Sequence, residues 1–168
     1  VIEAQRIFEL DISKFEILIH EKSYVHAIVK FKNGLTKLLI HDTKMDIPIF
    51  NTINFSPNVK ISNKQINFNL LNNLNFNKVN RKKFPNINIL KHITNKISLF
   101  ETVLISANDE LVDMYLDNKI KFNEISSYLY KIINLKEFTK YKKKTPKNVN
   151  EIDILSRYVR LKTQTLCI

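Results

Sequence analysis

Glycine is almost absent from this 168-residue chain, which contains a single one, Gly34. A dinucleotide-binding fingerprint requires three glycines, a Walker P-loop two, and the nucleophile elbow of a hydrolase two. The composition therefore excludes all three sites within these residues. The single cysteine, Cys167, likewise excludes a disulfide framework and a zinc site of the CxxC type.

Long apolar runs are missing as well. No stretch approaches the roughly 18 uncharged residues of a membrane-spanning helix, and nothing at the N-terminus is typical of a signal peptide. We therefore expect no membrane partner. The chain begins with Val1 rather than Met, within a segment predicted to be helical, and we expect it to be the tail of a longer protein.

Arginine is scarce in a chain whose net charge is +11. Only four of the 27 basic residues are Arg, and the other 23 are Lys. Clustered basic residues bind nucleic acid by neutralising phosphates, but arginine is the better contact for phosphates and bases. Because Lys, Asn and Ile are abundant while Gly and Ala are rare, we attribute the charge to an AT-rich genome rather than to a nucleic-acid partner. The densest run, residues 140–144, is predicted to be a solvated loop between helices.

Short strands are predicted near the N-terminus, after a helix over residues 1–9. The first strand covers residues 15–20, and the next two cover residues 24–32 and 35–41. The last two flank Asn33-Gly34, and an Asn-Gly pair between alternating apolar residues is the strongest short-range signal of a hairpin. We predict a type I′ turn there, since both residues tolerate a positive φ. One face of the second strand is expected to carry Val25, Ala27, Val29 and Phe31.

Residues 51–84 carry no periodic pattern, and eleven of these 34 residues are Asn. We predict a long irregular connection that its isolated apolar side chains pin to a core. The alternative is a surface that stacks single-stranded nucleic acid, because aromatic rings among lysines are typical of such surfaces. The four phenylalanines of this segment are Phe55, Phe68, Phe76 and Phe84.

Helical periodicity begins after Pro85. Helices are predicted over residues 86–100, 107–118, 123–134 and 150–161. The third is expected to begin with Asn123 as its cap and Glu124 in its first turn, and its buried face is predicted to carry Ile125, Leu129, Ile132 and Ile133. The predicted fold class is therefore α+β: a small sheet with an Asn-Gly hairpin, followed by a C-terminal α-helical bundle.

Histidines and one carboxylate are the candidate metal ligands. His20 and His26 lie six residues apart, nearly 20 Å in an extended chain, so they share a metal only if residues 21–23 fold back. The chain has four histidines, His20, His26, His41 and His92, and each is also a typical polar residue at a strand end. Glu3 is either a carboxylate ligand or an exposed charge, and the residues alone leave both interpretations open.

A series of motifs resembles the 1-deoxy-D-xylulose 5-phosphate reductoisomerase family. They are Val1-Ile2-Glu3-Ala4, Ile17-Leu18-Ile19-His20-x-x-Ser23-x-x-His26, the Asn33-Gly34 hairpin, Met45-x-x-Pro48-Ile49, Phe84-Pro85 and Ser106-Ala107-Asn108-Asp109-Glu110-Leu111. The last resembles a degraded form of that family's Asn-Ala-Ala-Asn-Glu helix start. The resemblance extends to about residue 160, and the order and spacing of its motifs make it specific.

This resemblance implies a C-terminal portion of the enzyme. Residues 1–50 would be the C-terminal part of the catalytic domain, residues 51–84 the Asn-rich connection and residues 85–168 the bundle. The family converts 1-deoxy-D-xylulose 5-phosphate to 2-C-methyl-D-erythritol 4-phosphate in non-mevalonate isoprenoid biosynthesis, using NADPH and Mg or Mn. It is a homodimer that uses the hairpin region. A bacterial cytoplasm is the implied location, with a plastid as the alternative.

The resemblance also assigns site residues. Glu3 matches a glutamate of the acidic cluster around the metal, and Val1 follows directly after the position of a ligating glutamate, which the chain therefore lacks. Ser23 and His26 match residues that bind the substrate, and Met45 matches a residue near the nicotinamide. No catalytic residue is assigned. Because the nucleotide-binding domain and most metal ligands would precede this chain, we expect the fragment alone to be inactive.

Some positions depart from the family pattern. Glu21 replaces a proline and Lys44 replaces an aspartate beside Met45, which puts turnover in doubt more than the fold. The alternative function is a small basic RNA-binding module, with residues 140–147 and the Asn-rich segment as its surface. That function requires the lysines to form one continuous face.

Overall fold

A computed structural model describes residues 1–54, 56, 59–61 and 66–167 of the chain. The chain divides into two compact units. The first contains Val1–Glu16 and Asn80–Ile168, and the second contains Ile17–Val79. Strands and helices are both present, so the predicted α+β fold class is confirmed. The boundaries of these units differ from those of the predicted domains. The N-terminal segment groups with the C-terminal helices, and the predicted boundary at residue 50 falls inside a helix.

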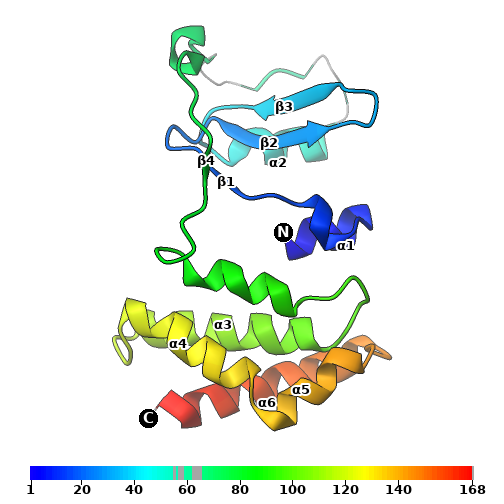
Figure 1. Ribbon diagram of the computed structural model, residues 1–168, viewed down its shortest axis with the longest axis vertical. Coiled ribbons are helices and arrows are strands. Elements are labelled where there is room, and N and C mark those ends of the chain that lie inside the picture. The colour runs from blue at the N-terminus through cyan, green and yellow to red at the C-terminus, as the bar shows by residue number, and fades with distance from the viewer. Residues whose placement is uncertain (55, 57–58, 62–65, 168) are drawn as a thin grey trace. The chain divides into compact units, whose positions relative to one another are not determined.

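The first unit is helical (Figure 1). In chain order its elements are α1 (Ile2–Phe8), η1 (Ile12–Lys14), η3 (Pro85–His92), α3 (Phe100–Leu116), α4 (Phe122–Ile133), α5 (Lys136–Thr139), η4 (Lys140–Lys143) and α6 (Val149–Cys167), where η marks a 3-10 helix. Both α4 and α6 pack against α3, which is the central helix of the bundle.

The bundle core follows the predicted helical periodicity. The side chains buried on α4 are the four predicted from the sequence, Ile125, Leu129, Ile132 and Ile133. On α6, which covers the helix predicted over residues 150–161, the buried residues are Leu155, Val159 and Thr163. The largest fully buried side chains are Phe100 and Phe138. Apolar residues repeated every three or four positions share one face of a helix, so these local patterns determined the core correctly.

The predicted helix starts were less accurate. The helix predicted over residues 86–100 is wrong, because η3 ends at His92 and an irregular segment follows it. Helix α3 begins at Phe100, seven residues before the predicted start, so the Ser106–Leu111 motif lies inside the helix and does not begin it. Ser98 and Glu101 explain the earlier start: the Ser98 hydroxyl accepts the Phe100 amide (3.3 Å), and the Glu101 carboxylate accepts the Ser98 amide (3.2 Å). This is the Ser-x-x-Glu capping pattern.

The start of α4 also differs from its prediction. The helix begins at Phe122, so Asn123 is not its cap. Glu124 lies in the first turn as expected, and its carboxylate accepts the Lys121 amide at 2.7 Å. The lysine run predicted as a loop forms the 3-10 helix η4 between α5 and α6.

The second unit contains two small antiparallel sheets (Figure 1). Strand β1 (Leu18–Ile19) pairs with β4 (Asn77–Lys78), and β2 (Val25–Lys30) pairs with β3 (Thr36–Ile40). The unit also contains α2 (Asp46–Ile53) and η2 (Phe68–Leu71). The end of α2 and the whole of η2 and β4 lie within residues 51–84, the segment that was expected to be irregular. Of its four phenylalanines, Phe55 lies outside the described residues, and Phe68 is exposed.

The predicted hairpin is confirmed, but its turn is not type I′. Phe31 and Leu35 close a loop of three residues, since the Phe31 amide donates to the Leu35 carbonyl oxygen (2.8 Å). Within this loop only Gly34 has a positive φ, 86°, and Asn33 does not. Instead, the Asn33 side chain accepts the Leu35 amide (3.1 Å). This is the pattern of a three-residue hairpin loop with glycine at its bulge.

The predicted alternation along β2 is interrupted. The pairing register shifts between Val25 and Ala27, which places a bulge there. As a result Val25 and Ile28 are half-buried, while Val29 is exposed. A one-residue shift moves the following side chains to the other face of a strand, and a bulge has this effect.

Candidate functional site

Ser23 lies in a turn between β1 and β2. Its amide donates to the His20 carbonyl oxygen (3.1 Å), and its φ is 55°. Positions 15–31 therefore do not form one continuous strand, which confirms the predicted break. The left-handed conformation costs a non-glycine residue about 1–2 kcal/mol, and such residues often mark functional sites. The Ser23 side chain is exposed, and its hydroxyl makes no hydrogen bond within the described part of the chain.

The Asn-rich segment holds this turn in place. The Lys22 ammonium donates to the carbonyl oxygens of Leu70 (3.2 Å) and Asn72 (2.8 Å). His20 Nδ1 lies 3.3 Å from the Asn75 carbonyl oxygen. Pairing of β1 with β4 adds backbone hydrogen bonds beside these contacts. The segment expected to be an irregular connection is thus a support for the Ser23 turn.

His26 stacks on His41 across the hairpin. The ring centroids are 3.6 Å apart and the ring planes differ by 4°. His26 Nε2 lies 3.4 Å from the His41 carbonyl oxygen, and the His41 amide donates to the Tyr24 carbonyl oxygen (3.2 Å). His41 is buried and His26 is exposed. The histidine pair was not predicted, although the predicted two-residue turn would place these two residues opposite each other, so the signal was present.

Met45 and α2 follow the hairpin. Met45 caps α2 and is 65 % exposed, so its thioether side chain is accessible. Asp42 shapes the approach to the helix, since its carboxylate accepts the Thr43 amide (2.7 Å). Ser23, His26 and Met45 all belong to the second unit.

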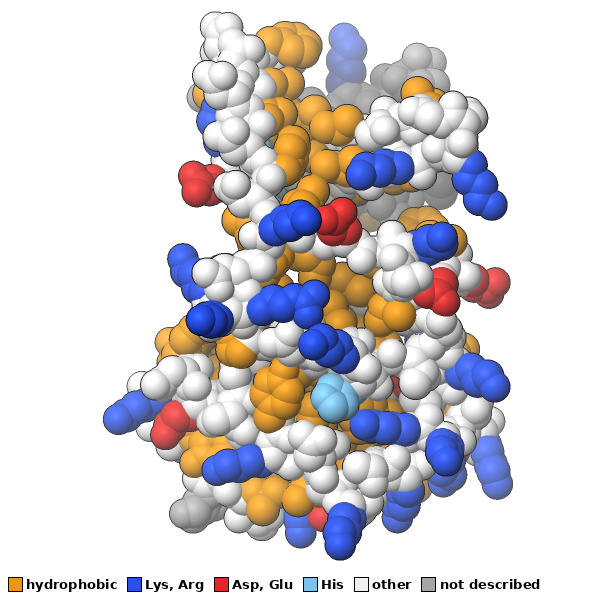
Figure 2. All heavy atoms as spheres, viewed as in Figure 1, with side chains coloured by type: hydrophobic (Ala, Val, Ile, Leu, Met, Phe, Trp, Pro, Cys, Tyr) orange, Lys and Arg blue, Asp and Glu red, His pale blue; other side chains and the backbone are white. Residues whose placement is uncertain are grey.

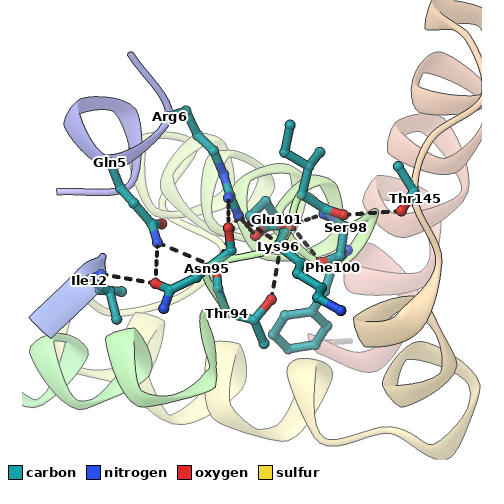
Figure 3. A network of polar contacts seen from close by, with 11 residues as sticks. Gln5, Arg6, Ile12, Thr94, Asn95, Lys96, Ser98, Phe100, Glu101 and Thr145 are labelled. Carbon is teal, nitrogen blue, oxygen red and sulfur yellow. Dashed lines mark hydrogen bonds and ion pairs between the residues drawn. The ribbon is translucent and has the colours of Figure 1, made fainter. Parts of the chain in front are cut away.

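Glu3 belongs to the first unit, in the first turn of α1. Its side chain is exposed and makes no ion pair or hydrogen bond to another described residue. The opposite side of α1 carries Gln5, which is 2 % exposed. Figure 3 shows that Gln5 and Arg6 reach the segment between η3 and α3, and Arg6 also forms an ion pair with Glu101 of α3. The helix is therefore attached through polar contacts, while Glu3 is left free.

The structure confirms the turn at Ser23 and shows that the predicted site residues are exposed. Whether these residues come together in one site stays a prediction. Binding of one metal-bound substrate by Glu3, Ser23 and His26 would require these side chains to lie within about 10 Å of one another. Glu3 belongs to a different unit from the other two residues, so this convergence stays a prediction. Among residues 1–54, 56, 59–61 and 66–167, no three His, Cys, Asp or Glu side chains gather as a metal site. Glu3 could supply one carboxylate ligand, the type that Mg²⁺ prefers.

A shallow hollow in the bundle is unrelated to the predicted site. It has a volume of about 530 Å³, and none of the predicted site residues lines it. Its lining includes Leu99, Tyr141, Lys144, Glu151, Leu155 and Tyr158. Lys144 and Glu151 form an ion pair there, which lowers the pKa of the Glu151 carboxyl and raises that of the Lys144 ammonium.

On the face that Figure 2 shows, the described lysines and arginines are scattered among polar and apolar groups. In the run at 140–144, Lys142 lies over the Phe100 ring (4.7 Å) and Lys144 pairs with Glu151. These contacts give two of the lysines structural partners inside the bundle. The distribution does not favour the RNA-binding alternative. No helix in the described residues is long and apolar enough to span a membrane.

The whole chain is similar to proteins of one family. A family model described as "DXP reductoisomerase C-terminal domain" matches residues 41–161. The 1-deoxy-D-xylulose 5-phosphate reductoisomerase of Pelagibacter ubique (strain HTCC1062) is 53 % identical over 168 residues, which are 100 % of this chain and 43 % of that protein. The same enzyme from Persephonella marina is 31 % identical over 83 % of this chain and 38 % of its own length.

Solved structures show the same fold. The Zymomonas mobilis reductoisomerase in complex with NADPH has a TM-score of 0.81 at 24 % identity, over 99 % of this chain and 43 % of that one. A DOX-P reductoisomerase with NADPH, fosmidomycin and magnesium has a TM-score of 0.88 at 20 % identity, over 99 % of this chain and 42 % of that one. The chain thus spans about two fifths of the length of the relatives it matches.

Proposed function

Because the chain belongs to the DXP reductoisomerase C-terminal domain family, we propose that it works as the C-terminal part of a 1-deoxy-D-xylulose 5-phosphate reductoisomerase. The reaction is the conversion of that sugar phosphate to 2-C-methyl-D-erythritol 4-phosphate with NADPH and Mg or Mn. The observation that carries the proposal is the 53 % identity to the Pelagibacter enzyme over every residue of this chain. Both units belong to that match.

The metal would be held in part by Glu3. Its carboxylate is exposed and free of partners among the residues described, so it can ligate a hard cation together with groups outside this chain. When bound, the cation would polarise a carbonyl and hold two substrate oxygens. Glu3 itself contributes negative charge and one ligand position on a short helix.

Ser23 and His26 would bind the sugar phosphate. The Ser23 hydroxyl is exposed and its backbone is held by the His20 turn, so it can donate to a substrate oxygen without first breaking a hydrogen bond. The His26 ring is fixed by stacking on His41, which limits its rotation and presents one side of the ring. Met45, exposed at the start of α2, would pack against the nicotinamide of NADPH.

The isolated chain is expected to be inactive. Gly34 is the only glycine, so these residues contain no glycine-rich nucleotide-binding loop. The test measures the loss of NADPH absorbance for the intact protein and for the isolated chain, each mixed with NADPH, Mg²⁺ and the sugar phosphate. The absorbance is expected to fall with the intact protein and to stay constant with the isolated chain. Turnover by the isolated chain would contradict the proposal that the catalytic apparatus is divided.

A homodimer through residues 24–41 belongs to the same proposal. β2 and β3 form a two-stranded sheet, and neither outer edge pairs with a further strand in the described chain. Two strands are marginal by themselves, and open edges favour pairing or covering. Sedimentation of the intact protein as a monomer would contradict the dimer. We propose a bacterial cytoplasm as the location, since the relatives compared above are bacterial, with a plastid as the alternative.

The role of Glu3 is tested in the intact protein with Glu3→Gln. The substitution keeps the shape and removes the charge, so the Mg²⁺ or Mn²⁺ concentration for half-maximal rate is expected to rise about tenfold or more. Glu9→Gln is the matched control, because Glu9 is an exposed glutamate at the other end of α1. An unchanged metal dependence in Glu3→Gln would show that Glu3 is only a surface charge.

A further inference from the structure

The segment between η3 and α3 binds α1 through one arginine. Arg6 Nη1 donates to the carbonyl oxygen of Asn95 (3.1 Å), and Nη2 donates to those of Thr94 and Lys96 (both 3.2 Å). Nη2 also forms the ion pair with Glu101 of α3 (Figure 3). A guanidinium is a planar fork with five N–H donors, so a single Arg6 side chain links α1, three consecutive carbonyls and α3.

The Asn95 side chain makes a second link. Its Oδ1 accepts from Gln5 Nε2 and from the Ile12 amide, both at 2.9 Å. Its Nδ2 donates to the Asp11 carboxylate. One amide therefore holds the middle of α1 and the start of η1 at the same time. The contact uses both the Oδ1 acceptor and an Nδ2 donor, which makes it specific for an amide at position 95.

These polar contacts determine the orientation of α1, since its apolar packing is weak. The helix has seven residues, too few to be stable in isolation. Ile7 is 65 % and Phe8 67 % exposed, and of its apolar residues only Ile2 packs against the bundle core. Glu3 lies one turn before Arg6 on the same helix, so its direction follows the position that Arg6 and Asn95 impose.

We propose that Arg6 and Asn95 are positioning residues for Glu3, and that the helical bundle contributes to metal affinity through them. The inference rests on the proposed function, in which Glu3 ligates the divalent cation. Neither residue would touch the metal. Their effect is to hold the carboxylate of an otherwise weakly packed helix where the remaining ligands require it, because a ligand displaced by about 1 Å loses much of its contribution.

The test is direct binding of Mn²⁺ to the intact protein, measured by the electron paramagnetic resonance signal of free Mn²⁺ without substrate or NADPH. Asn95→Asp places a carboxylate against Asp11 and removes the donor, and Arg6→Lys keeps the charge but loses the fork. Both variants are expected to raise the Mn²⁺ dissociation constant about tenfold. Arg157→Lys is the matched control, because Arg157 is exposed and its side chain makes no hydrogen bond or ion pair to the described residues; the dissociation constant of this variant is expected to stay within twofold.

A rescue variant separates positioning from general damage. In Asp11→Asn with Asn95→Asp the donor and acceptor are exchanged: position 11 donates to position 95, while the contacts of Gln5, Ile12 and Ser13 keep their acceptors. The double variant is expected to recover Mn²⁺ affinity to within about threefold of the original protein. A general loss of stability, followed in parallel by thermal unfolding, would lower the folded fraction without changing the affinity of the folded protein.

The outcomes distinguish the inference from the proposed function. Weaker Mn²⁺ binding in Glu3→Gln, Asn95→Asp and Arg6→Lys, with recovery in the double variant, supports both. Weaker binding in Glu3→Gln alone overturns the positioning role and leaves the function of Glu3 in place. Unchanged binding in Glu3→Gln overturns both, because then no metal ligand on α1 remains to be positioned.

Discussion

Phe138→Ala is expected to remove a large part of the stability of the helical bundle. Phe138 lies on α5 and has no exposed surface. Its ring meets the Tyr158 ring of α6 edge-on, with centroids 6.0 Å apart and planes at 73°. The side chain thus fills space between α5, α6 and the central helix α3, and alanine would leave a cavity there.

The expected cost can be estimated from burial. Replacing a fully buried phenylalanine by alanine costs about 3–5 kcal/mol, because the transfer of the ring from water is lost and the cavity collapses only in part. The lost aromatic pair with Tyr158 accounts for about 0.5–1.5 kcal/mol of this. Native domains are stable by about 5–15 kcal/mol, so Phe138→Ala would remove a large fraction of the stability and would bring a bundle at the lower end of this range close to unfolding.

Urea unfolding followed by far-UV circular dichroism measures this loss, because most of the helix is in the bundle. Phe122→Ala is the matched control: Phe122 begins α4 and is 72 % exposed, so its loss is expected to cost less than about 1 kcal/mol. Equal losses of stability in the two variants would refute the assignment of Phe138 to the core.

Two further predictions concern the hairpin and the half-buried His92. Gly34→Ala is expected to destabilise the hairpin by about 1–2 kcal/mol through backbone strain alone, because the φ of Gly34 is 86° and the space around it is open. Amide exchange of β2 and β3 measures this loss of stability. An equal loss of stability in Gly34→Asn would argue against strain. Burial and the nearby Lys142 ammonium, 3.3 Å from Nδ1, lower the pKa of His92. The unfolded chain therefore binds a proton at a higher pH than the folded chain, so stability should fall as pH decreases from about 6.5 towards the folded pKa. In His92→Gln this part of the pH dependence of the urea midpoint should disappear, and an unchanged slope would assign it to other groups.

Local sequence patterns determined the helical faces, the hairpin and the family. The buried residues of α4 follow from spacings of three and four, and Gly34 marks the hairpin because few other residues adopt its φ. The predicted strands stop at residue 20 and resume at residue 24, because Glu21 and Lys22 are poor strand formers, and the turn at Ser23 agrees with this break. Each of these signals lies within a few neighbouring residues, and short-range preferences are sufficient to read it. The function of Glu3, Ser23, His26 and Met45 stays a prediction that rests on the family.

Contacts between distant segments were decided only in the tertiary structure. Asn95 lies in the irregular segment between η3 and α3 and binds residues more than 80 positions earlier, a contact that no periodic pattern predicts. Lys22 and His20 gain their partners about 50 residues further along, in a segment whose composition predicted no structure. Hydrogen bonds of this kind depend on which backbone carbonyls the fold brings within 3 Å or so of a side chain. Every residue has a backbone carbonyl, so the amino-acid sequence does not distinguish the one that will be used, and the support of the Ser23 turn and of α1 became visible only with the fold.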